Sequence, residues 1–300
     1  MKRILITGGS GLIGQGLTPL LQSKGYEVLH LGRKENLSGK VKTYKWNVEE
    51  GKLDERAFEN IDSIVHLAGM GIADARWSEK RKKEIIDSRV KSSELLFNVI
   101  EKNKIKLSSF IGASAVGFYG AVSSEKIYTE ADPAASDFLG TCCRLWEESY
   151  NGIISTGVRT VIIRVGVVLS GRGGALVKMA GPVKKGIGSA LGNGKQIVPW
   201  IHEKDICGIF LKAIEDESMK GIFNASAPQF QSNAELTGAI AKQLNKKLWA
   251  PAVPAFVLKI MFGEMAGMFL QGSKVSTEKI QKEGYSFQFP EISDAMKNLL

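Results

Sequence analysis

The stretch RILITGGSGLIG, residues 3–14, decides how the rest of the chain is interpreted. It begins with a short β-rich run from Arg3 to Thr7 and enters a turn that contains several glycines. It then opens a segment, Leu12 to Lys24, whose apolar residues recur with helical spacing, and Gly25 marks its end. The sequence therefore predicts a strand, a tight glycine turn and a helix at the start of a βαβ unit.

The glycines of this turn have the spacing that a phosphate-binding turn requires. Gly9, Gly11 and Gly14 satisfy G-x-G-x-x-G, and Gly8 extends the pattern to T-G-x-x-G-x-x-G. The first glycines allow a tight turn, Gly11 allows the backbone to approach a pyrophosphate, and Gly14 allows close packing of helix on strand. Free N–H groups at the helix start would then hold the phosphates. The residues predicted to bind a dinucleotide here are Gly8, Ser10, Gly11, Leu12, Ile13 and Gly14.

Strand and helix signals continue to alternate along the chain. Continuous apolar strands that alternate with helices indicate a parallel sheet covered on both faces, which is a doubly wound α/β fold. We expect further strands at 27–31, 43–46, 63–67, 109–113, 160–169 and 221–225, and a helix at 89–101.

The character of the chain changes after residue 169. Residues 171–194 are rich in glycine, and the chain after residue 227 is helical before a strand-and-turn segment at 284–290. We interpret residues 1–227 as a Rossmann domain, with 171–199 contributing to a smaller lobe, and residues 228–300 as the C-terminal lobe on the substrate side. The apolar stretch 253–270 is predicted to be a buried or pocket-lining helix.

Composition and cysteine usage are those of an ordinary globular chain. The 300 residues are 44% hydrophobic and 24% charged, which is enough to bury a core without disulfides or a metal. Cys142, Cys143 and Cys207 form neither a disulfide framework nor a zinc-site spacing. The apolar run Ile4–Ile6 is too short for a signal peptide. We expect a reducing, cytoplasmic location and no metal site.

The net charge of +9 is compatible with an anionic ligand of some kind. The densest basic run, Lys80 to Lys83, lies between Glu79 and Glu84 and is typical of a solvated helix face. No aromatic residues interleave with it, so the sequence does not favour a nucleic-acid partner. We expect a small-molecule substrate, no membrane partner, and a monomer or homodimer.

The end of the second predicted strand indicates which dinucleotide is preferred. Leu31 is followed by Gly32, Arg33 and Lys34, where an acidic residue would accept the ribose hydroxyls of NAD. A guanidinium can instead form paired hydrogen bonds with a 2′-phosphate. We therefore predict NADP(H) rather than NAD(H), with Gly32 and Arg33 in the site; a solvent-facing Arg-Lys pair is the alternative.

Several further motifs occur in a familiar order. TGGSGLIG is followed by VHLAG at 65–69, EIIDSR at 84–89, GASAVGFYG at 112–120, RVGVVLSGRGGAL at 164–176 and WIHEKD at 200–205. The chain resembles the extended short-chain dehydrogenase/reductases, and most closely the "epimerase family protein" branch with its characteristic C-terminal domain of unknown function. The resemblance implies an NADP(H)-binding Rossmann domain. It also implies cofactor contacts from Leu67, Ala68, Gly69, Glu84, Arg89 and Val168.

The sequence departs from the resembled family at the catalytic centre. Members usually carry a Ser or Thr after the fifth strand and a Tyr-x-x-x-Lys about 25 residues later, in which the Lys assists proton transfer by the Tyr. Ser114 fits the serine position, but Leu139 and Cys143 occupy the Tyr and Lys positions. Ser114 is therefore a candidate for orienting a substrate oxygen, or for capping a strand end. Tyr119 is a candidate substitute acid, or a packing residue.

Two functions remain open from the sequence. The first is an NADP(H)-binding oxidoreductase or isomerase that acts on a small carbonyl or sugar-like substrate without the usual Tyr-Lys pair. The second is a catalytically inactive regulatory or binding protein that responds to NADP(H). Two smaller expectations accompany them. Cys142 and Cys143 should pack in the interior, and His202 and Asp205 should hydrogen-bond the backbone near a strand-to-helix junction.

Overall fold

An eight-stranded sheet forms the centre of the computed structural model, which describes residues 1–300. The strands are arranged in the order β12-β8-β6-β5-β1-β2-β3-β4 and are parallel except for β4, which runs antiparallel to β3. Their bounds are β1 Arg3–Thr7, β2 Glu27–Gly32, β3 Thr43–Asn47, β4 Lys52–Leu53, β5 Ser63–His66, β6 Ser109–Ala115, β8 Arg159–Val165 and β12 Gly221–Ala225. The doubly wound α/β Rossmann fold is confirmed.

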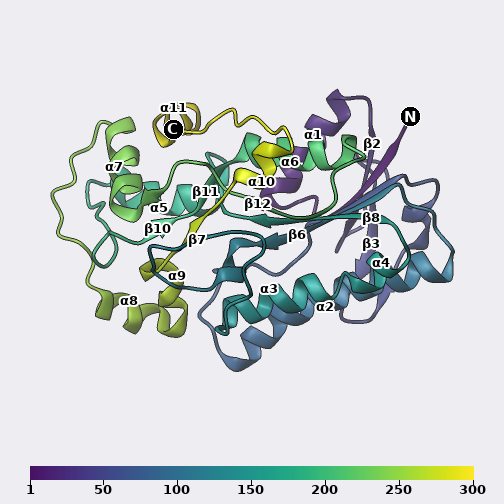
Figure 1. Cartoon of the computed structure of the whole chain (residues 1–300), viewed down its shortest axis with the longest axis horizontal. Coiled ribbons are helices and arrows are strands. Elements are labelled where there is room, and N and C mark those ends of the chain that lie inside the picture. The colour runs from purple at the N-terminus through teal and green to yellow at the C-terminus, as the bar shows by residue number, and fades with distance from the viewer.

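Helices cover both faces of this sheet (Figure 1). The helices α1 and α6 lie on one face, and α2, α3 and α4 lie on the other. Their bounds are α1 Leu12–Ser23, α2 Glu79–Lys102, α3 Phe138–Glu148, α4 Asn151–Ser155 and α6 Glu203–Glu215, with short 3-10 turns η1 Glu55–Phe58 and η2 Val116–Tyr119. The predicted helix at 89–101 is thus the second half of α2, which begins earlier because Ser78 caps it.

The parallel register brings the carboxyl ends of the central strands to one edge. Thr7 of β1 lies opposite His66 of β5, and His66 lies opposite Gly112 of β6. Further along, Ser114 of β6 lies opposite Arg164 of β8. Ligands of doubly wound sheets bind outside this edge, so the register places the polar strand ends where a site is expected.

The predicted single strand at 160–169 is wrong, because the chain breaks at Gly166. The strand β8 ends at Val165, and Val167–Ser170 forms β9, which pairs with β11, Trp200–His202. At Gly166 a Cβ would lie 2.4 Å from the Pro199 carbonyl oxygen, so only glycine allows these backbones to meet. The chain therefore leaves the main sheet here and enters the smaller lobe.

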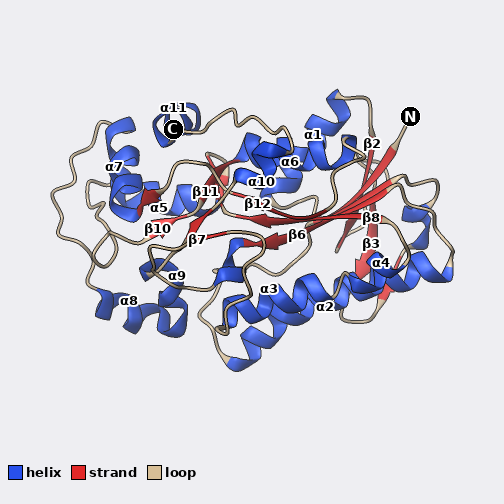
Figure 2. Ribbon diagram, viewed as in Figure 1, coloured by secondary structure: helices blue, strands red, loops and turns tan.

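The smaller lobe has its own hydrophobic cluster and lies at the left of the sheet (Figure 2). Leu176, Trp200, Leu236 and Met296 are among the buried residues of this cluster. The elements of this part are α5 Gly174–Lys184, β10 Ile197–Val198, β13 Gln231–Ser232, α7 Asn233–Gln243 and α11 Ile292–Leu299. The cluster draws on both sides of the predicted boundary at 227, and the division into two domains stays a prediction.

The strand expected at 284–290 is absent, and the segment is irregular. Its backbone is held by Asp205 instead, whose carboxylate accepts hydrogen bonds from the amides of Gln288 at 2.7 Å and Phe289 at 3.0 Å. His202 accepts a bond from the Lys204 amide and stacks on Phe289 at 3.8 Å between ring centroids. The backbone-bonding roles expected of His202 and Asp205 are confirmed.

The apolar stretch 253–270 is not one buried helix. It forms α8 Ala255–Phe262, η3 Gly263–Ala266 and α9 Gly267–Leu270, and the break falls at Gly263, where φ is 61°. The strand β14, Lys274–Val275, then pairs with β7, Ile127–Tyr128, before α10, Glu278–Lys282. None of the helices combines the length and the apolar character that crossing a bilayer requires.

Candidate functional site

The glycine turn between β1 and α1 is tightly packed on its inner side. At Gly8, where φ is 71°, a Cβ would lie 2.9 Å from the Leu67 backbone, and at Gly9 it would lie 2.4 Å from the His30 ring. At Gly14 a Cβ would lie 2.6 Å from the Cα of Gly9. Gly11 differs, because it is exposed and a Cβ there would meet only the Gly8 carbonyl oxygen, at 3.1 Å. The turn therefore presents Gly11 outward and needs the other three glycines for its shape.

The start of α1 has the properties of an anion site. Gly11 occupies the N-cap position, no side chain caps the helix, and its first turn has no acidic residue. The amides of Leu12 and Ile13 donate to no protein acceptor. Unpaired N–H groups at the positive end of a helix suit a phosphate. The residues of this turn therefore fit the phosphates of a dinucleotide.

Arg33 follows β2 as an exposed cation without a protein partner. Arg33 forms no ion pair, and the nearest acid in sequence, Glu35, pairs with Arg56 at 3.2 Å instead. Gly32 packs against Thr43 of β3, where a Cβ would lie 2.8 Å from the Thr43 methyl group. A free guanidinium at the end of the second strand fits a phosphate on the ribose.

A chain of hydrogen bonds ties the glycine turn to the loop after β5. The Thr7 hydroxyl accepts bonds from the amides of Leu67 and Ala68, both at 3.2 Å. Its own proton is then directed to His66 Nδ1 at 2.7 Å, so the neutral ring carries its proton on Nε2, 3.2 Å from the Ser92 hydroxyl. Burial lowers the pKa of His66 to about 3. A neutral histidine thus holds Leu67 and Ala68 beside the turn.

Arg89 extends this arrangement from α2. A Cβ at Gly69 would lie 3.2 Å from the Arg89 guanidinium carbon, so that side chain lies against the loop. The guanidinium also lies 4.9 Å from the centre of the Trp146 ring and donates to the Ile85 carbonyl. It pairs with no carboxylate, which leaves a half-buried cation beside residues predicted to contact the cofactor.

Glu84 and Val168, which the resemblance also implies as cofactor contacts, lie in two different parts of the structure. Glu84 pairs with Arg81 at 3.6 Å and Lys80 at 4.0 Å near the start of α2, and no hydrogen bond joins it to residues 67–69. Val168 lies in β9, close to Gly174 at the start of α5. A Cβ at Gly174 would lie 3.0 Å from the Leu12 side chain, so this region contacts the glycine turn.

Ser114 and Tyr119 belong to one buried polar network. The Ser114 hydroxyl donates to Glu147 Oε1 at 2.6 Å, and Arg164 forms a paired contact with the same carboxylate at 2.8 and 2.9 Å. Arg164 Nη1 also donates to the Tyr119 hydroxyl at 2.9 Å, and that hydroxyl donates to Asn224 Oδ1 at 2.7 Å. The network therefore connects β6, η2, α3, β8 and β12 behind the strand ends.

The geometry gives no support to Tyr119 as a substitute acid. Its ring is 1% exposed, and its hydroxyl already has a donor, Arg164, and an acceptor, Asn224. Burial raises the pKa of Tyr119 to about 12, so it would release a proton poorly near neutral pH. Ser114 is also buried, and because its proton goes to Glu147, its hydroxyl oxygen can take part in a further hydrogen bond only as an acceptor.

Buried, uncharged residues occupy the two positions where the wider family carries its Tyr and Lys. Leu139 and Cys143 are both buried on α3, facing Gly117, where a Cβ would lie 3.6 and 3.7 Å from them. Burial raises the pKa of the Cys143 thiol to about 12, so it is neutral near pH 7. The interior packing expected of Cys142 and Cys143 is confirmed.

Sequence reasoning missed two members of the network. Asn224 interrupts the apolar strand β12, and Glu130 accepts a bond from its amide at 2.8 Å. A buried polar residue within an otherwise apolar strand was the available signal for Asn224. Nothing in the sequence around Glu130 distinguishes it from a solvated turn residue, because its partner is 94 residues away.

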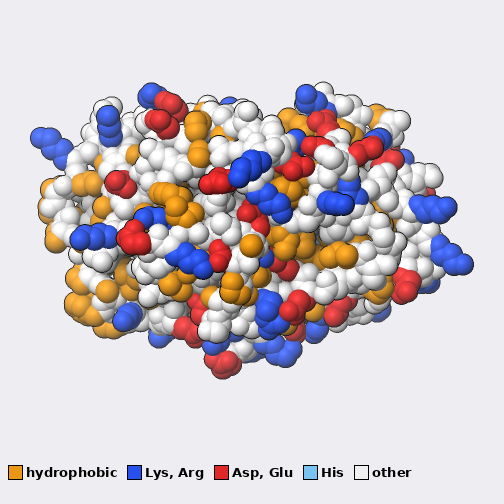
Figure 3. Space-filling view, viewed as in Figure 1, with side chains coloured by type: hydrophobic (Ala, Val, Ile, Leu, Met, Phe, Trp, Pro, Cys, Tyr) orange, Lys and Arg blue, Asp and Glu red, His pale blue; other side chains and the backbone are white.

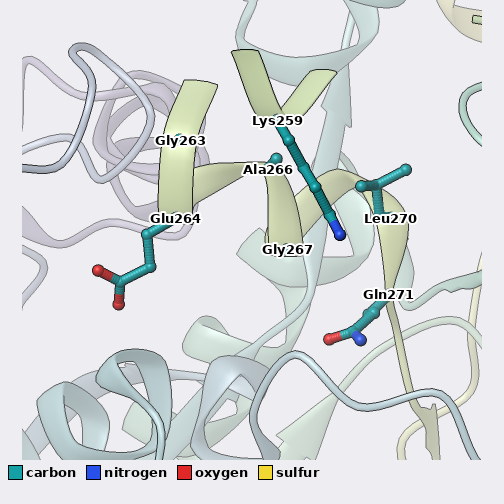
Figure 4. A pocket seen from close by; sticks show the side chains of 7 residues that line it. All are labelled: Lys259, Gly263, Glu264, Ala266, Gly267, Leu270 and Gln271. Carbon is teal, nitrogen blue, oxygen red and sulfur yellow. The ribbon is translucent and has the colours of Figure 1, made fainter. Parts of the chain in front are cut away.

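Two open hollows lie near the N-terminal end of α2, and no residue of the glycine turn lines either of them. One, of about 370 Å³, is lined by η3, α9 and Lys259 of α8 (Figure 4). The other, of about 550 Å³, lies between the starts of α2 and α3. Glu264 borders both; its carboxylate points away from Lys259 in Figure 4 and pairs with Lys82 at 2.9 Å.

Comparison with known families matches nearly the whole chain. Residues 4–226 match the profile of the NAD dependent epimerase/dehydratase family, and residues 253–299 match a domain of unknown function, DUF1731. The chain is 36% identical over 300 residues to epimerase family protein YfhF of Bacillus subtilis, covering 99% of this chain and 97% of that protein. It is 32% identical over 302 residues to human epimerase family protein SDR39U1, covering 99% of each.

Solved structures agree with the fold. The crystal structure of human SDR39U1, isoform 2, with NADPH has a TM-score of 0.87 at 31% identity and covers 99% of this chain and 98% of its own. The UDP-glucose 4-epimerase of Thermus thermophilus, in complex with NAD, has a TM-score of 0.80 at 21% identity, covering 98% of this chain and 96% of that one. The second likeness concerns the fold alone.

Proposed function

The chain belongs to the NAD dependent epimerase/dehydratase family, and from that premise we propose that it binds NADP(H) at the glycine turn. We further propose that it uses this cofactor to oxidise, reduce or isomerise a small carbonyl or sugar-like compound. The proposal rests on two sets of hydrogen-bond donors that have no acceptor in the protein. These are the free amides at the start of α1 and the unpaired guanidinium of Arg33 at the end of β2.

The preference for NADP(H) rests on charge at the end of β2. NAD would leave Arg33 without an anionic partner, whereas the 2′-phosphate of NADP(H) would accept paired hydrogen bonds from it. The human relative is described with NADPH, and more distant structures are described with NAD. Arg89, beside Gly69, offers a second cation to the cofactor.

The proposed chemistry uses Ser114, because the site lacks the Tyr-Lys pair of the wider family. Bound NADP(H) would supply or accept a hydride. Because the Ser114 proton is donated to Glu147, Ser114 would accept a hydrogen bond from a substrate hydroxyl. Water would exchange the proton, because the Tyr119 hydroxyl already bonds Arg164 and Asn224. The segment Gln196–Pro199 offers no arginine to a nucleotide diphosphate, so the proposed substrate is small. We expect negligible epimerase activity on UDP-galactose.

A second candidate is an NADP(H)-binding protein without turnover. The burial of Leu139 and Cys143 favours it, since no ionisable group of suitable pKa occupies the positions where the wider family places its acid and its lysine. The free, buried cysteines agree with a reducing compartment, and we propose the cytoplasm for either candidate.

A turnover experiment separates the two candidates. NADPH fluorescence is followed with a panel of small aldehydes, ketones and keto sugars, for the native chain, Ser114→Ala and Ser109→Ala. Ser109 is a matched control, because it is buried on the same strand and bonds only Ser63, at 2.8 Å. Catalysis predicts NADPH consumption that Ser114→Ala lowers at least about tenfold and Ser109→Ala does not. Binding of NADPH without consumption across the panel would establish the second candidate.

A further inference from the structure

The segment 246–261 holds five of the fourteen large hydrophobic residues that are exposed in the chain. Apart from the terminal Met1, the three most exposed large hydrophobic side chains are Trp249, Ile260 and Phe256, at 73%, 70% and 65%. Met261 is 58% exposed. The segment runs down the left edge of the molecule from α7 into α8, and hydrophobic side chains gather at the lower left over α8 (Figures 1 and 3). We call these four side chains the α8 surface.

The α8 surface is held outward by packing on its inner side. Leu258 is buried beneath the helix, and Phe262 packs on Phe269 of α9 at 5.1 Å between ring centroids. Phe256 and Ile260 are four residues apart on α8 and therefore share its outer face. The apolar side chains are exposed by a fixed helix, and no element of this chain covers them.

The charges within the segment that carries the α8 surface have one sign, and the acid that follows it, Glu264, is paired with Lys82. Between Glu235 and Glu264 the sequence contains no acidic residue and four lysines, Lys242, Lys246, Lys247 and Lys259. All four are exposed and none forms an ion pair. Exposed aromatic and aliphatic side chains with lysines beside them suit a partner that has an apolar interior beneath a layer of negative charge.

We propose that the α8 surface docks on a lipid bilayer that carries anionic head groups. Trp249 and Phe256 would enter the interface region, where aromatic rings are favoured, and the lysines would contact the head groups. A second copy of the chain fits less well, because a two-fold contact through this surface would bring its four lysines together, and the neighbouring acid Glu264 is already paired with Lys82. The sequence alone favoured no membrane partner; the exposed side chains change that expectation.

The test is co-sedimentation of the full chain with vesicles of phosphatidylcholine, with or without about one third phosphatidylglycerol. We expect binding to the anionic vesicles that weakens with salt. The triple variant Trp249→Ser, Phe256→Ser, Ile260→Ser should lose at least about tenfold in binding. Lys246→Gln, Lys247→Gln, Lys259→Gln should remove the preference for anionic vesicles. The control variant Ile127→Ser, Ile154→Ser, at exposed sites elsewhere, should bind as the native chain does.

Circular dichroism and thermal unfolding confirm that each variant is folded. The proposal is overturned if the native chain binds neither kind of vesicle, or if the folded serine variant binds vesicles as well as the native chain does. It is also overturned if the native chain binds no vesicles and sediments as a dimer that the serine variant converts to a monomer. In that case a second copy covers the surface.

Discussion

Arg33 is the single residue on which the choice of cofactor depends. Its guanidinium has no protein partner, and removing a charge-assisted phosphate contact costs about 1.5–3 kcal/mol, or roughly 10- to 150-fold in affinity. We expect Arg33→Ala to weaken NADPH by this factor and NADH little, in a fluorescence titration. Arg56→Ala is the matched control, because Arg56 is an exposed arginine at the same edge that pairs with Glu35 and Asp54. Equal losses of both cofactors in Arg33→Ala would contradict the assignment.

Tyr119 is the residue for which sequence and structure point in different directions. The sequence allowed a catalytic acid or a packing residue, and the contacts with Arg164 and Asn224 favour the second. Tyr119→Phe would leave both partners short of one buried hydrogen bond, so we expect a loss of about 1–3 kcal/mol in the free energy of unfolding. Chemical denaturation measures it. NADPH affinity and any turnover should stay unchanged; a tenfold loss of turnover at unaltered stability would restore the catalytic role.

At the scale of the elements, His66 joins β1, β5 and α2 through Thr7 and Ser92. Because burial lowers its pKa from 6.5 to about 3, the folded chain binds fewer protons than the unfolded chain between those pH values. The contribution of the neutral His66 ring to the free energy of unfolding is therefore complete above pH 6.5. It is lost as the pH falls from 6.5 to about 3, by about 1.4 kcal/mol per pH unit at most.

The variant His66→Gln tests this link between the elements. It should show a flatter dependence of unfolding free energy on pH from 6.5 downward than the native chain, measured by urea denaturation at several pH values. His30 and His202 remain in both proteins and contribute equally, since burial also lowers their pKa. Parallel profiles for the two proteins would show that His66 does not titrate between the folded and unfolded states as described.

For the molecule as a whole, the sequence predicted the sheet and the glycine turn because both depend on local patterns. Apolar runs of strand length and glycines at fixed spacing carry their meaning within a few residues. The break at Gly166 depends on Pro199, and the irregular segment at 284–290 depends on Asp205. Neither partner is close in sequence, so the apolar runs there looked like ordinary strands.

In the candidate site, too, the sequence predicted what depends on local patterns and missed what depends on contacts between distant residues. The phosphate-binding residues form one short segment, and sequence analysis identified them together. The buried network collects Tyr119, Glu147, Arg164 and Asn224 from four separate elements, and only the folded arrangement of η2 and α3 against β8 and β12 brings them into contact. The roles of such residues are set by their partners, which the sequence does not show.

Ligand-induced thermal stabilisation is the most direct test of whether NADP(H) binds at the glycine turn. With NADPH at about 100 times its Kd, the native chain should gain about 2.7 kcal/mol in unfolding free energy and roughly 4 °C in Tm. Gly11→Val should fold as the native chain does, because Gly11 faces outward with φ of −75°, and should show no shift with NADPH. Gly238→Val, on α7, where an added Cβ meets no atom within 4 Å, should keep the full shift. A shift in Gly11→Val equal to that of the native chain would place the cofactor elsewhere and contradict the account.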